Sequence, residues 1–372
     1  MKPLKIVIFA QWVLPIINPR SHRTWQLALN FAKQGHDVTV YALLGKTDYS
    51  KYEKEYGLKI KNLGYSWYGC VNSDGGKQPL HCRAIMKLLG NKFLYPDIEL
   101  KRLVKKSLSS LTDNIDLLIT IASPHTIHWG AAEVMNKPNI NCWIADCGDP
   151  FMLNPFHTPS PKYEKLERSW CEKTNAITIP IEEGKNGYYK DYHHKIHIIP
   201  QGFDFSETKL ANYNINKIPT FAFSGVVYPG MRDPSNFLKF LLNLKIDFKF
   251  IVYSKYRKQF EPYATDLRDK FVFYNYIPRN LLIYELSKMD FLININNIGN
   301  VQQPSKLIDY ALSKRPILSI SSEFGETEQA NFVQFLNHNY NNRTEVRNIE
   351  QFDIQNVCQN FIDLYNKCIM HE

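Results

Sequence analysis

The sequence predicts an α/β fold built from two doubly wound parallel-sheet domains that face a cleft. The chain has 372 residues, more than one ordinary hydrophobic core organises. Short β-branched runs alternate with amphipathic helical stretches along residues 5–204, and the same alternation restarts at residue 220. Hydrophobic residues make up 44% of the chain and charged residues 22%, which is a globular composition. Two successive β-α arrays therefore predict two domains of the same class.

The first array begins with a βαβ unit. Residues 5–10, KIVIFA, are typical of a buried parallel strand. Apolar positions at helical spacing predict a helix over 21–34, which Gly35 ends, and a strand follows over 36–43. The later elements of this array are a helix over 97–111, strands over 115–122 and 139–147, a helix over 161–173, and strands over 176–181 and 195–204.

The second array continues the alternation. We expect strands over 220–225, 248–254, 271–277, 290–296 and 315–321, and helices over 234–243, 279–288 and 305–313. The first domain should then span 1–200 and the second 201–349, with a C-terminal helix in 350–372 that packs back on the first domain. Gly202 lies at the join, where we expect a turn of positive φ, a hinge, or both.

Charge and cysteine content narrow the function classes. The net charge is +9 with a pI near 9.0, which favours anionic partners such as nucleic acid, anionic lipid or phosphorylated small molecules, although a generally basic proteome also explains it. Seven cysteines without a CxxC pair make a disulfide framework or a structural zinc site unexpected. The apolar N-terminus is interpreted as a strand and no run reaches transmembrane length, so we expect a cytoplasmic protein.

Ligands of open parallel sheets bind at the carboxyl ends of the strands, so the strand-to-helix turns are the places to search. The first turn, residues 10–23, has no glycine and therefore lacks the GxGxxG dinucleotide fingerprint, which disfavours a nicotinamide oxidoreductase. It carries Arg20, His22 and Arg23 at a helix start. These side chains predict either an anion site or a solvated basic loop.

The stretch PSKLIDYALSKRPILSI, residues 304–320, places polar groups at another helix start. Ser305 occupies an N-cap position, and the free N–H groups and dipole there favour an anion. Lys306 adds a charge that reaches a phosphate, and the Asp309 carboxylate can accept bonds from both ribose hydroxyls. Together they describe a nucleoside diphosphate site, although Ser305 and Asp309 taken alone are better explained as a cap and a dipole partner.

This stretch resembles the donor-site helix of GT-B glycosyltransferases, specifically the retaining family 4 group. KIVIFA, KIHIIPQGFD and FAFSGVVYPGMRDPSNFLKFL resemble further segments, so the resemblance covers most of the chain and implies two Rossmann-like domains. It implies that Arg232 and the turn at Gly225 hold the diphosphate, and that backbone near Tyr276 and Ile277 binds the base. This sequence departs from the family at Val226, which replaces a basic residue whose charge Lys306 would replace, at Val301, which replaces a glutamate, and at Asp309, where the family usually has glutamate.

The acceptor side of the cleft should come from the first domain. In TIASPHTIHWGAAEV, residues 120–134, His125 follows a strand, where relatives often place a histidine that touches the reacting sugar. Asp146 and Asp149 follow the next strand, and a carboxylate there could orient or deprotonate the acceptor hydroxyl. The simpler interpretations are a loop histidine bonded to backbone and a helix-capping aspartate.

No Asp-x-Asp pair occurs, which agrees with a metal-independent donor site and no cofactor besides the nucleotide-diphosphate sugar. The cluster of His193, His194 and His197 has no standard metal spacing, so we expect it on the surface.

The resemblance implies sugar transfer from a nucleotide sugar to a saccharide or lipid-linked saccharide, with retention, in bacterial surface polysaccharide or glycolipid assembly. The basic helix over 97–111 and the segment 81–93 predict either contact with an anionic membrane surface, as for a peripheral protein on the inner face of the plasma membrane, or a solvated basic face. No nucleic-acid partner is expected, because no binding module is recognisable. Two alternatives stay open: a nucleotide-sugar epimerase of the same fold, and a non-enzymatic anion- or nucleic-acid-binding protein.

Overall fold

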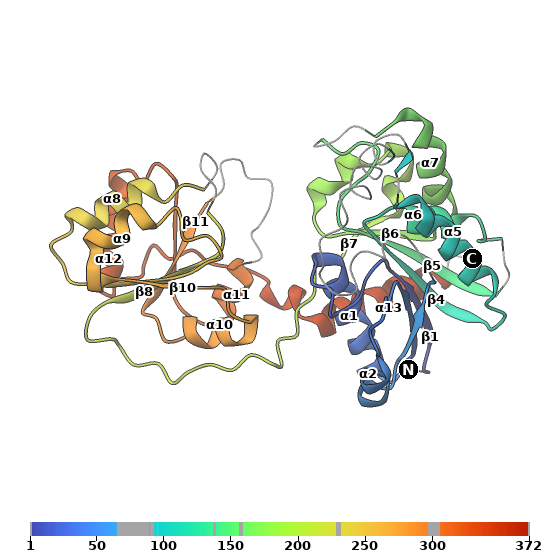
Figure 1. Ribbon diagram of the computed structural model, residues 1–372, viewed down its shortest axis with the longest axis horizontal. Coiled ribbons are helices and arrows are strands. Elements are labelled where there is room, and N and C mark those ends of the chain that lie inside the picture. The colour runs from blue at the N-terminus through green and yellow to red at the C-terminus, as the bar shows by residue number, and fades with distance from the viewer. Residues whose placement is uncertain are drawn as a thin grey trace. The chain divides into compact units, whose positions relative to one another are not determined.

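The computed structural model describes residues 2–64, 89, 93–94, 96–136, 139–155, 159–227, 232–296 and 306–370. The chain divides into two compact units, shown in Figure 1. The first unit comprises Met1–Phe203 and Gln351–Glu372, and the second comprises Asp204–Glu350.

Within the described residues, the first unit contains a seven-stranded sheet in which every pairing is parallel, with the order β3-β2-β1-β4-β5-β6-β7. Its strands are β1 (Lys5–Phe9), β2 (Asp37–Ala42), β3 (Lys59–Asn62), β4 (Ile115–Ala122), β5 (Ile140–Cys147), β6 (Ala176–Ile179) and β7 (Ile196–Ile198). Val7 of β1 lies opposite Leu118 of β4, and the chain reverses its direction of travel across the sheet between these two strands.

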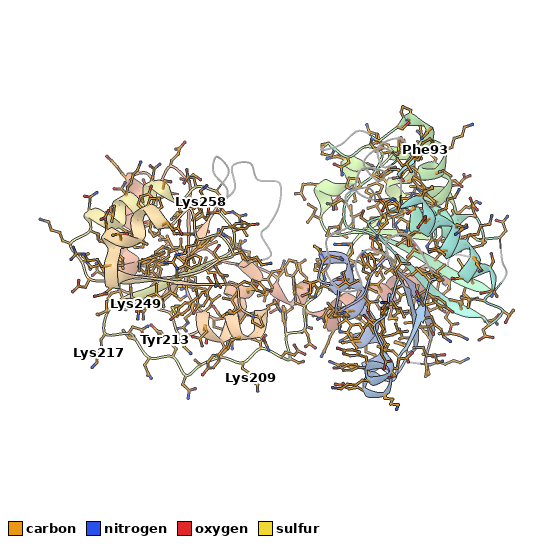
Figure 2. All side chains as sticks on the ribbon, in the orientation of Figure 1. Phe93, Lys209, Tyr213, Lys217, Lys249 and Lys258 are labelled. Carbon is orange, nitrogen blue, oxygen red and sulfur yellow. The ribbon has the colours of Figure 1, made fainter. Side chains whose placement is uncertain are left out.

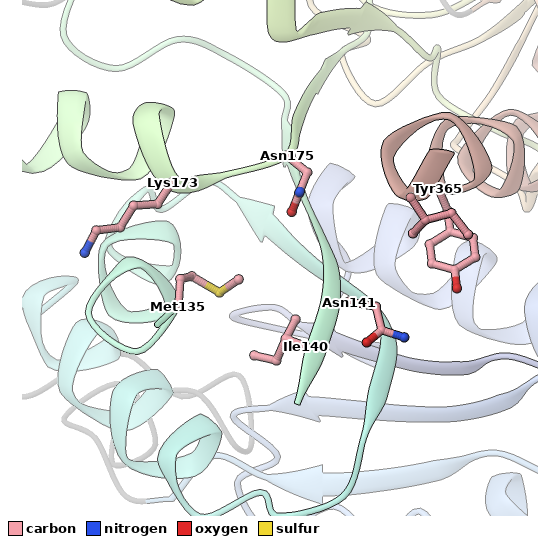
Figure 3. A pocket seen from close by; sticks show the side chains of 7 residues that line it. Met135, Ile140, Asn141, Lys173, Asn175 and Tyr365 are labelled. Carbon is pink, nitrogen blue, oxygen red and sulfur yellow. The ribbon is translucent and has the colours of Figure 1, made fainter. Parts of the chain in front are cut away.

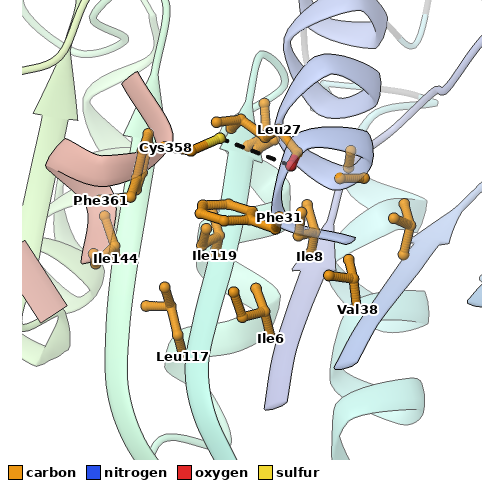
Figure 4. Packing of buried hydrophobic residues seen from close by; sticks show 14 of the residues in the cluster. Ile6, Ile8, Leu27, Phe31, Val38, Leu117, Ile119, Ile144, Cys358 and Phe361 are labelled. Atoms are coloured by element: carbon orange, nitrogen blue, oxygen red, sulfur yellow. Dashed lines mark hydrogen bonds between the residues drawn. The ribbon is translucent and has the colours of Figure 1, made fainter. Parts of the chain in front are cut away.

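Helices cover both faces of this sheet, which is what a doubly wound fold requires. One face packs against α1 (Pro19–Lys33), α2 (Ser50–Tyr56) and α13 (Ile354–Met370), and Figure 4 shows Phe31 and Phe361 meeting over Ile119. The other face packs against α5 (Ile98–Ser109), α6 (Thr126–Ala132) and α7 (Glu164–Lys173). Short 3₁₀ turns lie at Pro161–Tyr163, Glu182–Gly187 and Lys190–Lys195.

The C-terminal helix α13 returns to the first unit, where its apolar face joins the core on the α1 side. The chain enters it through backbone hydrogen bonds between Phe203 and both Phe352 and Ile354. A Cβ built on Gly202 would lie 2.5 Å from Ile354 Cδ1, so this glycine permits the close approach of α13. The expected positive φ at Gly202 is wrong, because it is not among the positive-φ residues of the described chain.

The second unit has, within its described residues, a five-stranded parallel sheet of order β10-β9-β8-β11-β12. Its strands are β8 (Thr220–Ser224), β9 (Lys249–Tyr253), β10 (Phe271–Tyr274), β11 (Phe291–Ile295) and β12 (Ile317–Ile320). A phenylalanine-rich core packs one face against α8 (Ser235–Asn243), α9 (Glu261–Leu267) and α12 (Glu326–Leu336). The other face packs against α10 (Arg279–Leu286) and α11 (Lys306–Leu312), and 3₁₀ turns lie at Arg268–Lys270 and Ile349–Phe352. The predicted α/β class with two parallel sheets is confirmed.

Figure 2 labels four exposed lysines of the second unit, Lys209, Lys217, Lys249 and Lys258. Among the described helices, none combines the length and the apolar character that crossing a bilayer requires.

Candidate active site

The carboxyl ends of β8 and β11 form the switch point of the second sheet, because successive strands spread in opposite directions from this pair. Open parallel sheets bind ligands at such a point. Gly225 follows β8 with a φ of +132°, which side-chain-bearing residues rarely adopt. Lys306, the first residue of α11, lies beside it: Lys306 Nζ donates to the Ile295 carbonyl at 3.3 Å and lies 4.9 Å from the Phe223 ring centre. The structure therefore brings Lys306 and Gly225 together, and the predicted diphosphate turn lies at the switch point.

Tyr310 links α11, the helix that carries Lys306, to β8 and β11. Its buried hydroxyl accepts the Ser224 N–H at 2.7 Å and lies 3.2 Å from the Ser224 carbonyl and 3.1 Å from the Ile293 carbonyl. Because Tyr310 follows Lys306 by four residues, both lie on the same face of α11. Helix α11 is thus tied to β8 and β11 one turn after Lys306, and the cation is held over the ends of both strands.

The electrostatics of the Lys306 ammonium are unfavourable without a ligand. Loss of hydration and the nearby Arg232 cation hold the pKa of Lys306 well below its ordinary value. Arg232 Nη1 donates to the Val226 carbonyl at 3.2 Å. Among the residues that the structure describes, no carboxylate lies within ion-pair distance of Lys306. Two cations that approach each other in a partly buried turn are an arrangement that an anion would stabilise.

Asp309 is paired within the chain. Arg279 Nε, at the start of α10, donates to Asp309 Oδ1 at 2.6 Å. Burial raises the pKa of Asp309, and the Arg279 charge opposes that rise. Sequence reasoning missed Arg279, because it lies 30 positions away and its helix start gave no separate signal.

The predicted base-binding segment lies just before Arg279. Tyr276 is 63% exposed, and Ile277 packs partly against the core on the α10 side. Since Arg279 contacts Asp309, this segment and the first turn of α11 are neighbours. Ser305 and Val301 lie outside the described residues.

In the first unit, Asp146 is enclosed by donors. Arg23 Nη2 and Nε lie 2.8 and 3.2 Å from its carboxylate oxygens, and Thr178 Oγ1 donates at 2.8 Å. Burial alone would raise the pKa of Asp146, but the Arg23 charge and these hydrogen bonds hold it below the usual value. With 2% exposure, Asp146 has no face open to an acceptor, and the geometry favours a structural role in place of the expected catalytic one.

His125 and Asp149 are in contact through the backbone. His125 Nε2 lies 2.9 Å from the Asp149 carbonyl oxygen, and the imidazole is only 5% exposed. This is the backbone-bonded histidine that the simpler interpretation describes. The Asp149 side chain, in contrast, is exposed at the end of β5. The Arg20 side chain lies nearby and is 23% exposed, and its Nη1 is 3.8 Å from Asp146 Oδ2. Burial lowers the pKa of Arg20, and the Asp149 charge opposes that change. Of the three predicted acceptor-side residues, Asp149 alone presents its side chain to solvent.

Two other features bear on partners. Lys101 and Lys105 of α5 bind Glu133 at 2.6 and 2.8 Å, so part of the basic face is neutralised within the chain. A pocket of about 470 Å³, drawn in Figure 3, is lined by Asn141, Lys173 and Tyr365 among others. It lies at the amino end of β5, the edge of the sheet opposite Asp149, and is therefore not part of the candidate site.

No protein-family model matches the sequence, and no curated protein matches it either. Solved structures do match. A glycosyltransferase from Rickettsia africae ESF-5 aligns over 100% of both chains with a TM-score of 0.64 and 10% identity. Anabaena Alr3699/HepE in complex with UDP and glucose covers 98% of this chain and 100% of its own, with a TM-score of 0.56 and 9% identity.

A third match is an S. aureus TarM variant in complex with Fondaparinux, alpha-GlcNAc-glycerol and UDP, with a TM-score of 0.54 and 11% identity over 98% of this chain and 100% of its own. At such identities the likeness concerns the fold. All three chains match over almost their whole length, so both units and their order are shared. The chain therefore has the GT-B fold of these glycosyltransferases.

Proposed function

We propose that the protein is a glycosyltransferase that moves a sugar from a nucleoside-diphosphate sugar to a hydroxyl acceptor. The observation that carries the proposal is the position of two cationic side chains at the switch point of the second sheet: Lys306 lies beside Gly225, and Arg232 donates to the carbonyl of the next residue, Val226. A diphosphate bound there would interact favourably with both charges, at the place where this fold class binds ligands. Asp309 lies one turn further along α11, at the place where the ribose of that nucleotide would follow.

The chemistry follows from the charge that develops on the leaving group. As the bond between the sugar and the diphosphate breaks, negative charge accumulates on the departing phosphate oxygen. Lys306 and Arg232 would stabilise this charge. Tyr310 ties the helix of Lys306 to the sheet, so the Lys306 side chain needs little reorganisation during the reaction. The two side chains take the part that a metal ion plays elsewhere, so we propose transfer without a required metal or further cofactor.

The acceptor is proposed to meet the first unit at the carboxyl end of β5. The exposed Asp149 carboxylate is the group there that could orient or deprotonate a hydroxyl. The resemblance to retaining enzymes supports retention at the anomeric carbon. It also supports a saccharide or lipid-linked saccharide acceptor in bacterial surface polysaccharide or glycolipid assembly, with a peripheral cytoplasmic location at the membrane. Lys101 and Lys105 contribute less to membrane attraction than their number suggests, because Glu133 binds both.

A thermal-shift panel of nucleoside diphosphates and their sugars tests the donor site. A ligand that binds only the folded chain raises the melting temperature. UDP belongs in the panel because the matched HepE and TarM complexes contain it. We expect one diphosphate series to raise the melting temperature of wild type but not of Lys306→Ala. Equal shifts in both proteins, or none with any nucleotide, would refute the site.

The reaction itself is tested by release of free nucleoside diphosphate in the presence of candidate acceptors, with and without added Mg²⁺. Release that depends on the acceptor and not on Mg²⁺ supports the proposal. Release without any acceptor, accompanied by a changed sugar, would indicate the epimerase alternative. The anomeric configuration of the product, determined by NMR, tests retention.

A further inference from the structure

A buried cluster of metal-binding side chains lies in the first unit, apart from the donor site and independent of the proposed function. His125 and His128 come from the start of α6, and Cys147 ends β5. Their exposed fractions are 5%, 0% and 1%, and one potential ligand atom from each lies within 4.8 Å of the others. Glu167 of α7, 1% exposed, lies beside them with its Oε2 3.9 Å from His125 Nδ1.

The hydrogen bond of His125 shows which of its nitrogens is available. A carbonyl oxygen only accepts, so Nε2 must carry the hydrogen that it shares with the Asp149 carbonyl at 2.9 Å. In the neutral ring Nδ1 then holds the lone pair. Within the described part of the chain this atom is buried without a hydrogen-bond partner. It faces the Glu167 carboxylate, and two electron-rich groups in contact call for a cation between them, either a metal ion or a proton on Nδ1.

His128 is oriented in the way of a metal ligand. One ring nitrogen, Nδ1, lies 2.7 Å from Thr120 Oγ1, which also accepts the Trp143 indole N–H at 2.8 Å. The other, Nε2, lies 3.3 Å from Cys147 Sγ. Metal-binding histidines typically use the second nitrogen to donate to an oxygen of the protein, and that bond fixes the ring. His125 has such a bond to a backbone carbonyl, and His128 Nδ1 lies at hydrogen-bond distance from the Thr120 hydroxyl.

The negative charge of Glu167 also favours a cation in this cluster. Its Oε2 accepts the Trp170 indole N–H at 2.8 Å. In the part of the chain that the structure covers, no lysine or arginine is paired with this carboxylate. A fully buried carboxylate without a cation is costly. A divalent ion bound to the Cys147 thiolate beside Glu167 would bring the net charge of the cluster to zero.

We propose that His125 Nδ1, His128 Nε2 and Cys147 Sγ bind a zinc-class divalent transition metal, with Glu167 Oε2 placed to complete the set. Nitrogen and thiolate ligands with one carboxylate suit tetrahedral zinc, and a site closed to water is a structural one. Ligand atoms around tetrahedral zinc lie about 3.3–3.7 Å apart, so the side chains must contract by about 1 Å. The metal would join the start of α6 and the end of β5 to α7, close to the segment that carries Asp149.

Cobalt(II) is the probe, because tetrahedral cobalt bound to a thiolate gives both charge-transfer and intense visible absorption. The full chain, without a histidine tag and after chelation, is titrated with cobalt(II) and then zinc(II), and its metal content is measured. We expect about one equivalent of cobalt per chain with a thiolate band, which zinc displaces. Wild type that binds no cobalt, or that shows no thiolate band, would overturn the proposal and leave a proton between His125 and Glu167.

Matched variants locate the metal. Cys147→Ser should abolish the thiolate band, and His128→Gln should weaken cobalt binding at least about tenfold, since loss of even an outer partner of a metal ligand costs this much. Cys358→Ser is the control: Cys358 is equally buried but packs near Leu27 on the opposite face of the sheet, as Figure 4 shows. Cobalt bound alike by Cys147→Ser and Cys358→Ser would lie elsewhere, for example at the exposed His194, and would refute the assignment.

Discussion

Arg23 and Lys306 are both cations held near the carboxyl edge of a parallel sheet, but their surroundings differ in charge. In the first unit, Arg23 donates two hydrogen bonds to Asp146 and lies near the Pro200 carbonyl. In the second unit, Lys306 contacts the Ile295 carbonyl oxygen and the Phe223 ring. The positive charge of Arg232 acts on it as well. The first arrangement is complete within the chain, whereas in the second no carboxylate of the described residues lies within ion-pair distance of Lys306.

This difference separates a structural charge from a functional one. A buried ion pair with both members in the chain links two segments, here α1 and the end of β5. Losing one member lowers the stability of the fold. A cation without a carboxylate costs stability in the free protein and gains a partner only when an anionic ligand arrives. Substitution of Arg23 should therefore lower the free energy of unfolding, whereas substitution of Lys306 should lower the rate of sugar transfer.

The largest expected effect on stability is that of Arg23→Met. It removes a guanidinium from a pair in which both side chains are 2% exposed, and leaves the buried Asp146 carboxylate with the Thr178 hydroxyl and the more distant Arg20. Breaking such a pair typically costs about 3–5 kcal/mol. Urea unfolding followed by circular dichroism measures it. Lys306→Met is the control and should lose little or no stability. A comparable loss in both variants would remove the distinction between the two sites.

Lys306→Ala should have the largest effect on catalysis. Removing a preorganised group that stabilises developing charge typically lowers turnover about 100- to 1,000-fold, or about 2.7–4 kcal/mol. Single-turnover kinetics with the donor identified by thermal shift measures the loss, and the urea midpoint shows whether the fold is intact. Arg232→Ala should also lower turnover. Full transfer rates in both variants would show that the diphosphate binds elsewhere.

The comparison also shows what the sequence reveals. Hydrophobic periodicity predicted both parallel sheets, because buried strands such as β1 and β11 are continuous apolar runs. It missed β3, Lys59–Asn62, whose edge position leaves a single buried residue in a polar tetrapeptide. It also missed α6, whose seven buried residues show no polar face from which a helical period could be recognised.

Site residues were accessible to sequence reasoning where they lie close together in the chain. Lys306 and Asp309 share one helical turn, so their spacing alone suggested a nucleotide. The partners of Asp146 and Asp309, in contrast, lie 123 and 30 positions away, and only tertiary packing brings them together. The same applies to His128 and Cys147, which are 19 positions apart on different elements. Absence of a CxxC pair therefore argued against a zinc site that spacing could not have revealed.

Asp309→Ala should have an intermediate effect, on nucleotide binding. The carboxylate is expected to accept hydrogen bonds from the ribose, and bonds to a charged group are worth about 1.5–3 kcal/mol. Calorimetry with a nucleoside diphosphate and its 2′,3′-dideoxy analogue isolates this contribution. Wild type should prefer the ribonucleotide by roughly tenfold or more, and Asp309→Ala should bind both alike. If wild type makes no distinction, Asp309 serves only to hold Arg279.

The smallest effect is a pH dependence, which has the same sign in the two units but falls in different pH windows. The lowered pKa of Asp146 gives stability that is present above the ordinary range of a carboxyl group and is lost as the pH falls through the folded value. Lys306 contributes the same sign of pH dependence at higher pH. Between its lowered folded pKa and the unfolded value near 10.5, the unfolded chain binds more protons, so the free energy of unfolding rises with pH across this window.

A bound diphosphate would reverse the preference of Lys306, because the anion favours its charged form. Above the folded pKa of Lys306, binding should then take up a proton, and affinity for the fully ionised diphosphate should fall by up to about tenfold per pH unit. Calorimetry in two buffers of different ionisation enthalpy measures the uptake directly. Lys306→Met should bind weakly without proton uptake and should lose the rise in stability on the alkaline side. Uptake that persists in Lys306→Met would assign the proton to another group, and the charge imbalance at this site would no longer explain how the donor is held.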